Sequence, residues 1–230
     1  MKLSQISRSI RHFLFPRDTK CVLCGKTAIG RSCICAACLE RLPPAAKNDR
    51  TIPGVTRLRS AYEYREPLRT LMHTFKYDNQ RYVAHFFALA MAQVDDFPAD
   101  CVLCAVPLHE QRVKERGFCQ TDELCSELSS ITGRQWIRSA LTRVRNTPSQ
   151  THLSYAERLH NMDDAFFAKG VKGLHVILVD DVVTTGSTLR ECAMTLRAAG
   201  AAEVYALTAC CVPSSELSSA ETSAEAPAEV

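Results

Sequence analysis

The stretch VILVDDVVTTGSTL, residues 176–189, decides the fold that we expect for this chain of 230 residues. Four apolar residues lead into two adjacent carboxylates, Asp180 and Asp181, and small hydroxyl residues follow on both sides of Gly186. A short, continuously apolar run is typical of a strand that is buried inside a parallel sheet. Ligands of open α/β sheets bind beyond the carboxyl ends of the strands, so this stretch predicts a sheet and a site together.

The flanking segments predict further strands and helices. Apolar residues at helical spacing, such as Leu68, Leu71, Met72 and Phe75, indicate helices that pack one face on a core. The expected strands cover residues 56–64, 100–108, 136–145, 175–181 and 203–212, and the expected helices cover 66–77, 81–94, 120–133 and 187–200. This order predicts an α/β fold with a doubly wound, mostly parallel sheet.

The composition is typical of a soluble globular protein, with 46% hydrophobic and 23% charged residues. No apolar run reaches the roughly 18 residues that a membrane-spanning helix needs. Residues 1–16 are basic but lack the apolar core of a secretion signal. We therefore expect a cytoplasmic protein without an integral membrane segment.

Residues 214–230 are rich in Ser, Ala and Glu, which predicts a disordered acidic tail. Without the four glutamates of this tail, the net charge of +3 becomes +7. The rest of the chain is therefore basic, which favours anionic ligands or partners. A charge that only improves solubility explains the same excess.

Five cysteines lie within eighteen residues near the N-terminus: Cys21, Cys24, Cys33, Cys35 and Cys38. Two C-x-x-C pairs, Cys21 with Cys24 and Cys35 with Cys38, are separated by ten residues. Such pairs can place four thiolates around one point, which predicts a structural zinc site without an open coordination position. Cys33 competes with Cys35 for the third position.

The cysteine cluster, the predicted sheet and the acidic tail divide the chain into three parts. We expect an N-terminal helix and a four-cysteine zinc-ribbon module in residues 1–45, the sheet domain in 46–213 and the tail in 214–230. A further C-x-x-C pair, Cys101 with Cys104, falls in a predicted strand. Strand residues an odd number apart point to opposite faces, so these two thiols are predicted to lie in the core and not to share a metal.

The two acids and the hydroxyl loop suit two different parts of one ligand. Backbone N–H groups between a strand and a helix, together with the helix dipole, favour a phosphate, and Gly186 permits its close approach. Carboxylates accept hydrogen bonds from sugar hydroxyls instead. A ribose 5-phosphate offers both groups. A buried strand followed by a helix capped by Ser187 or Thr188 would explain the hydroxyls but not the paired acids.

The same stretch resembles the 5-phosphoribosyl-1-pyrophosphate (PRPP) motif of type I phosphoribosyltransferases. More of the chain resembles the ComF family, in which a phosphoribosyltransferase-like domain follows a zinc ribbon. The matching features are the cysteine pairs, FKY at 75–77, VPLHEQRVKERGFCQ at 106–120 and RVRNTPSQTHLSYAERLHN at 143–161. The likeness spans residues 21 to about 212. The family usually has RGFNQ, whereas Cys119 here replaces the asparagine.

This resemblance implies a PRPP site in which Mg²⁺ and basic side chains neutralise the leaving pyrophosphate. Asp180 and Asp181 would be the catalytic pair that binds the ribose hydroxyls, and the loop after them would hold the 5-phosphate. The implied PRPP-binding residues are Asp180, Asp181, Val183, Thr184, Thr185, Gly186, Ser187, Thr188, Pro107, Leu108, His109, Arg116, Arg143 and Gln150.

The ComF resemblance also implies a role in DNA uptake. The protein would then bind single-stranded DNA through its basic body and work with a DNA translocase or another competence protein. Two alternatives are an active phosphoribosyltransferase of nucleotide salvage and a PRPP-sensing regulator without turnover. No segment identifies an acceptor for the ribosyl group, so the sequence leaves enzymatic activity open.

Overall fold

The computed structural model describes residues 20–28, 33–46, 50–77, 82–108, 113–114, 117–143, 166–213 and 216. The predicted N-terminal helix lies outside these residues, as does the predicted tail apart from Glu216. In the part of the chain that is described, no helix has the length and apolar character needed to cross a membrane.

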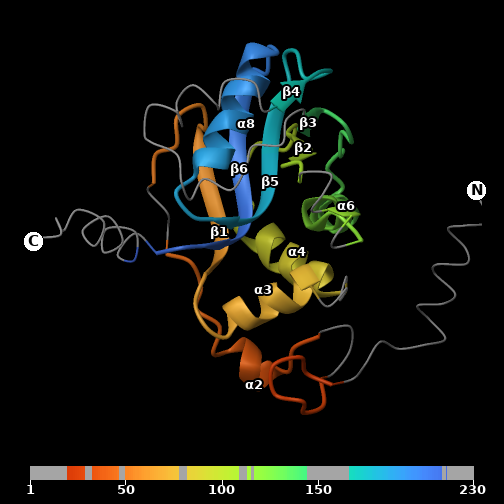
Figure 1. Ribbon diagram of the computed structural model, residues 1–230, viewed down its shortest axis with the longest axis vertical. Coiled ribbons are helices and arrows are strands. Elements are labelled where there is room, and N and C mark those ends of the chain that lie inside the picture. Colours follow the sequence, from red (N-terminus) through yellow and green to blue (C-terminus); the bar gives the residue numbers. More distant parts are fainter. Residues whose placement is uncertain are drawn as a thin grey trace, which may run out of the picture.

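A four-stranded parallel sheet forms the centre of the fold (Figure 1). Its strands are β1 (Arg57–Glu63), β2 (Val102–Ala105), β5 (His175–Val183) and β6 (Glu203–Cys211), in the order β1-β6-β5-β2. All three pairings are parallel, which confirms the predicted sheet. A separate antiparallel pair joins β3 (Leu141–Arg143) to β4 (Phe166–Ala168). The strand predicted at 136–145 is shorter, and β4 was not predicted.

Helices cover both faces of the parallel sheet (Figure 1). The helices α3 (Leu68–Tyr77), α4 (Val83–Val94) and α6 (Gln120–Thr132) pack on one face, and α8 (Ser187–Ala198) packs on the other. Along β5, Ile177 and Val179 join the core beneath the first group, whereas Val176 and Leu178 join the core beneath α8. All four are fully buried, and burial of such a side chain contributes about 1.5–3 kcal/mol.

The cysteine module packs directly on the sheet domain. It contains a short helix, α2 (Ala36–Leu39), that was not predicted. Ile34 and Leu42 belong to the same hydrophobic core as α3 and α4, and Figure 1 shows the module below these helices. The following chain lies along β1, where the N–H of Ala45 donates to the carbonyl oxygen of Ala61 at 3.1 Å. The residues that directly follow the module therefore pack on the sheet domain.

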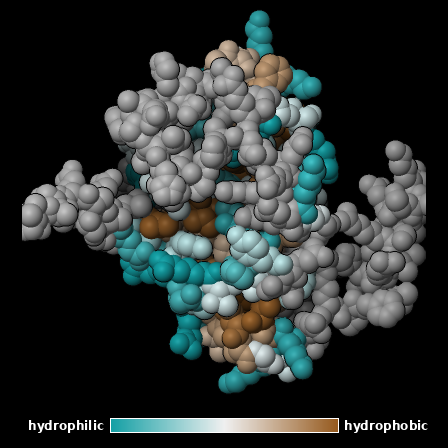
Figure 2. All heavy atoms as spheres, viewed as in Figure 1, coloured by the Kyte–Doolittle hydropathy of each residue, from teal (hydrophilic) through white to brown (hydrophobic). Residues whose placement is uncertain are grey.

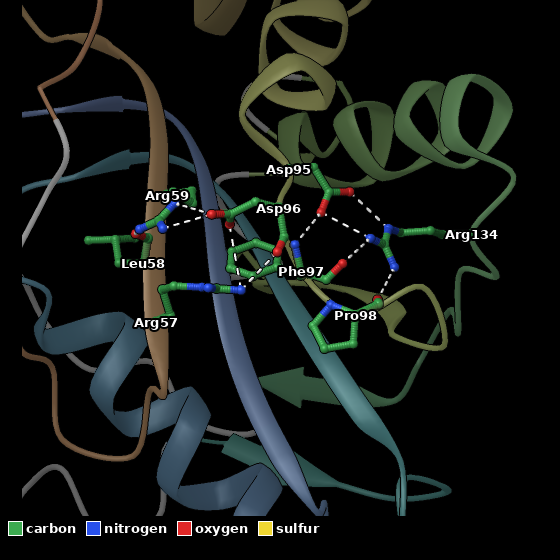
Figure 3. A network of polar contacts seen from close by, with 8 residues as sticks. All are labelled: Arg57, Leu58, Arg59, Asp95, Asp96, Phe97, Pro98 and Arg134. Atoms are coloured by element: carbon green, nitrogen blue, oxygen red, sulfur yellow. Dashed lines mark hydrogen bonds and ion pairs between the residues drawn. The ribbon is translucent and has the colours of Figure 1, made fainter.

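Arg134 fixes the turn that follows α4 (Figure 3). Its side chain is 10% exposed and binds both carboxylate oxygens of Asp95, from Nε at 2.8 Å and from Nη2 at 3.0 Å. The same guanidinium donates to the carbonyl oxygens of Phe97 at 3.1 Å and Pro98 at 2.6 Å. Since one planar side chain satisfies four acceptors, residues 95–98 are held in one conformation.

Hydrophobic residues reach the surface in small groups between hydrophilic ones on the face shown in Figure 2. The large exposed hydrophobic side chains among the described residues come from five different elements: Leu39, Tyr77, Leu89, Phe167 and Met194. Such dispersed side chains are normal for a protein surface and do not by themselves indicate a binding patch.

Candidate ligand-binding site and metal centre

The two acids lie near the carboxyl end of β5, where the neighbouring strand β2 has already ended. Ala105, the last residue of β2, pairs with Val179, whereas β5 continues alongside β6 as far as Val183. Asp180 and Asp181 therefore occupy the part of the strand that extends past β2. This is the edge at which open α/β sheets bind ligands, as the sequence predicted.

Lys76, next to the last residue of α3, neutralises one of these acids. Its Nζ lies 2.9 Å from Oδ2 of Asp181, and the two side chains are only 20% and 13% exposed. At the start of α6, the buried Gln120 donates from Nε2 to the carbonyl oxygen of Lys76 at 3.4 Å. Contacts of Lys76 thus connect α3 both to Asp181 on β5 and to Gln120 at the start of α6. Sequence reasoning noted FKY as a family feature but did not assign this lysine.

The environment of Asp180 favours its protonated form. Burial and the negative charge of Asp181 raise its pKa to about 8, against the opposing effects of the Asp181 N–H and of Lys76. That N–H donates to Oδ1 of Asp180 at 2.8 Å. The raised pKa of Asp180 reduces the negative charge of the acid pair, and the contact of Lys76 with Asp181 reduces it further.

The hydroxyl residues form a turn that leads into α8. Gly186 has φ +86°, and a Cβ atom at this position would lie 2.7 Å from Cδ1 of Ile52. Gly186 is the N-cap of α8 and makes no side-chain cap, so the alternative of a cap by Ser187 or Thr188 is wrong. The first turn of α8 has no acidic residue, which leaves the positive end of the helix dipole unopposed there.

Arg50 holds this turn from a distant part of the chain. Its Nη1 donates to the carbonyl oxygen of Thr184, and its Nη2 donates to that of Val212 at 2.8 Å. The guanidinium links the turn after β5 to the residue after β6 and adds a positive charge beside the expected phosphate position. No local signal in the sequence predicts a contact across 134 residues.

The turn after β2 adjoins the start of α6. The Thr121 hydroxyl donates to the carbonyl oxygen of Val106 at 2.7 Å, which fixes Pro107 and Leu108 beside Cys119. Burial raises the pKa of the Cys119 thiol, although hydrogen bonds with Thr121 and the Leu108 backbone oppose this rise. Cys119, the departure from the family pattern, therefore lies next to Pro107 and Leu108, two of the PRPP-binding residues that the resemblance implies.

The remaining predicted residues are placed in part. Val183 is buried at the end of β5, and Arg143 lies on β3 with its guanidinium 5.4 Å from the centre of the Phe166 ring. His109, Arg116 and Gln150 lie outside the described residues. The structure thus brings together the acids, the hydroxyl turn and two cations that the sequence did not assign.

Four thiols form a second centre in the cysteine module. The sulfur atoms of Cys21, Cys24, Cys35 and Cys38 all lie within 4.8 Å of one another, so this cluster could hold a metal ion. At each C-x-x-C pair a backbone N–H donates to the carbonyl oxygen of the first cysteine. The N–H of Cys38, for example, donates to Cys35 at 3.0 Å. Cys33 is not part of the cluster, so Cys35 is the third member.

The ionisation of these thiols suits a cation. Burial raises the pKa of Cys21, but hydrogen bonds from the backbone of Cys35, Leu23 and Cys24 outweigh it and bring this pKa down to about 6. Hydrogen bonding with Cys24 and burial raise the pKa of Cys38 to about 12. One thiolate is thus stabilised by backbone amides, and further thiolates need an added positive charge.

The chain has relatives with which it shares most of its length. It is 35% identical over 215 residues to DNA utilization protein YhgH of Salmonella typhi, a match that covers 90% of this chain and 88% of that protein. It is 34% identical over 152 residues to competence protein F of Haemophilus influenzae, with 61% of this chain and 66% of that protein covered.

Part of the sheet domain also matches a known domain family. Residues 124–224 match the phosphoribosyl transferase domain family. A solved glutamine phosphoribosylpyrophosphate amidotransferase from B. subtilis has 21% identity and a TM-score of 0.41, over 58% of this chain and 30% of that one, which is too low to add to the assignment. The four-stranded parallel sheet, the four-cysteine cluster and the near full-length match to YhgH agree. The chain belongs to the ComF family of proteins with a phosphoribosyltransferase-like domain.

Proposed function

We propose that this protein binds PRPP or ribose 5-phosphate, together with Mg²⁺, at Asp180, Asp181 and the turn at 184–188, and that it handles single-stranded DNA in DNA uptake. The observation that supports this most is the arrangement of the acid pair, Lys76 and the start of α8 at one edge of the sheet.

The charges at this edge suit a phosphorylated sugar. Two ionised carboxylates beside a phosphate site would repel the phosphate, but the raised pKa of Asp180 favours its neutral form and Asp181 is paired with Lys76. A protonated carboxyl can also donate to one sugar oxygen while it accepts from another hydroxyl. The neutralised pair can therefore bind a diol close to the phosphate without strong repulsion.

Mg²⁺ would serve the pyrophosphate end of the ligand. This ion prefers oxygen ligands and usually binds one or two carboxylates together with substrate phosphates. Asp181 is the carboxylate that the site offers to the ion, and Mg²⁺ would supply the charge neutralisation that a departing pyrophosphate requires. The turn at Pro107 and Leu108 and the cations predicted after it, including Arg116, would complete that end.

We propose Zn²⁺ as the ion of the four-cysteine cluster, because four thiolates in a closed set are the usual ligands of structural zinc. Its role would be structural. The core that contains Cys21 and Ile34 continues into α3, which carries Lys76. A zinc ion in the module would thus support the helix that neutralises the acid pair.

The role in DNA uptake rests on the relatives and on charge. Two relatives carry the names DNA utilization protein and competence protein F. The chain without its acidic tail has a net charge of +7, which favours phosphate backbones. A DNA translocase or another competence protein as partner, and a cytoplasmic location, stay predictions.

The first experiment is calorimetric titration of the full chain with PRPP and Mg²⁺. Asp181→Asn should weaken binding at least about tenfold, since a charged hydrogen bond to the diol is worth about 1.5–3 kcal/mol. Glu203→Gln is the matched control, because Glu203 lies at the opposite end of the sheet. Equal affinities of the wild type and Asp181→Asn would rule out the assigned site.

A second experiment separates the alternatives. Release of pyrophosphate from PRPP in the presence of a panel of bases would indicate a transferase, whereas binding without release would indicate a regulator or a DNA-handling protein. Fluorescence anisotropy with single-stranded DNA should show binding at low salt that weakens as salt rises. Absence of binding at low salt would refute the proposed handling of DNA.

A further inference from the structure

Three potential metal ligands of different chemistry meet at the amino end of the sheet. Asp100 and Cys101 directly precede β2, and His175 is the first residue of β5. Their ligand atoms, a carboxylate oxygen, a thiol sulfur and an imidazole nitrogen, all lie within 4.8 Å of one another. We propose that these three residues form a second metal site, which binds Zn²⁺ or a similar borderline divalent cation at the end of the sheet opposite to the acid pair.

The distances fit a zinc ion after small movements. Zinc bonds of about 2.0–2.3 Å in tetrahedral geometry place neighbouring ligand atoms about 3.3–3.8 Å apart. Nδ1 of His175 already lies 2.9 Å from Oδ2 of Asp100. The three ligand atoms therefore need to move by about 1 Å to reach the spacing of a tetrahedral zinc site, and side-chain rotations provide such shifts.

The state of the imidazole favours a metal over a simple ion pair. Nδ1 of His175 is inaccessible to solvent and, among the described residues, has no well-aligned hydrogen-bond partner, although the Asp100 carboxylate is so close. A buried polar atom normally has a partner. A cation between the nitrogen, the oxygen and the sulfur would satisfy all three atoms, whereas an ion pair leaves the Cys101 thiol without a role.

The loop that carries two of these ligands is already fixed. The Arg134 guanidinium that binds Asp95, Phe97 and Pro98 also approaches the carbonyl oxygen of Cys101 at 3.5 Å (Figure 3 shows the first three of these contacts). In addition, the Cys101 N–H donates to the carbonyl oxygen of Pro98 at 3.2 Å. A preformed loop reduces the conformational entropy that metal binding would otherwise remove.

Access and coordination number fit an open site. Cys101 is buried at 2% exposure, whereas the side chains of His175 and Asp100 are 33% and 67% exposed. An ion can therefore enter from solvent and keep water in its fourth position, as zinc sites with three protein ligands do. The thiol comes from the C-x-x-C pair of β2, but its partner is not Cys104, which lies in the core on the other face of the sheet.

The test counts metal ions on the untagged full chain. After addition of excess Zn²⁺ and removal of the loosely bound ion, elemental analysis should find two zinc ions per chain in the wild type. His175→Asn and Asp100→Asn should hold one, or bind the second at least about tenfold more weakly. Glu203→Gln is the matched control, because Glu203 pairs with His175 in the sheet without belonging to the three ligands.

Cobalt substitution gives an independent readout. Co²⁺ at the second site should add an absorption of a centre with one thiolate to that of the four-thiolate centre, and Cys101→Ser should remove only this addition. Should Cys101→Ser fail to fold, the zinc content of His175→Asn and Asp100→Asn still tests whether the second site exists. One zinc ion per wild-type chain, or two in His175→Asn, would overturn the proposal.

Discussion

The raised pKa of Asp180 makes a definite prediction for Asp180→Asn. An acid whose pKa is higher in the folded protein than in the unfolded chain stabilises the fold most at low pH, and this contribution is lost as pH rises towards the folded-state value. The pKa of Asp180 rises from 3.8 to about 8. Between pH 3.8 and pH 7 the aspartate ionises more readily in the unfolded chain than in the folded protein. The free energy of unfolding therefore falls by about 1.36 kcal/mol per pH unit, or by about 4 kcal/mol at pH 7.

Asparagine cannot ionise, yet its Oδ1 can still accept the hydrogen bond that the Asp181 N–H gives to Asp180. We expect Asp180→Asn to unfold at higher urea than the wild type, with a gain of about 2–4 kcal/mol at pH 7, since water entering the partly buried site reduces the full value. The gain should be small near pH 4, grow up to about pH 8 and then level off.

The measurement is urea unfolding of both proteins at several values between pH 4 and pH 9. The difference between them removes effects that both share, such as protonation of the four clustered cysteines. Asp181→Asn is the informative comparison, because it breaks the pair with Lys76 and should destabilise the protein. A gain in Asp180→Asn that does not change with pH, or no gain at pH 8, would refute the raised pKa of Asp180.

Three further predictions concern the cysteine cluster, the turn and the buried ion pair. Cys24→Ser should lose one zinc ion per chain by elemental analysis, whereas Cys33→Ser should keep it because Cys33 lies outside the cluster; the reverse result would contradict the ligand set. Gly186→Ala should cost about 1–3 kcal/mol in urea unfolding, and Ile52→Val, which removes the clashing Cδ1, should restore part of it; no restoration would show that the contact is not limiting. Arg134→Met should cost about 3–5 kcal/mol because it leaves the Asp95 charge buried, and a loss below about 1 kcal/mol would contradict this.

Local patterns were sufficient to predict most of the secondary structure. The stripe Leu68, Leu71, Met72 and Phe75 is buried along α3, and the apolar run before Asp180 is the central part of β5. The strand β4 has three residues, too few to produce a detectable alternation, and it depends on its pairing with β3. Likewise, the short helix α2 begins after Cys35 and contains Cys38, and its four residues are too few to show a helical pattern.

The candidate site shows where sequence reasoning stops. Asp180, Asp181 and the glycine of the turn are close together along the chain, so a local pattern could identify them. Lys76 and Arg50 reach the same place from α3 and from the segment before β1, and only the packing of the whole domain brings them there. The raised pKa of Asp180 is a further consequence of burial, which cannot be assigned from residue type alone.

The contact of Ile52 with the turn at Gly186 has a consequence for dissection of the molecule. Arg50 and Ile52 belong by chain position to the connection between the module and β1, but by contact they belong to the turn. A fragment that begins at residue 53 would keep every strand of the parallel sheet and both acids, yet lose the two side chains that support the turn.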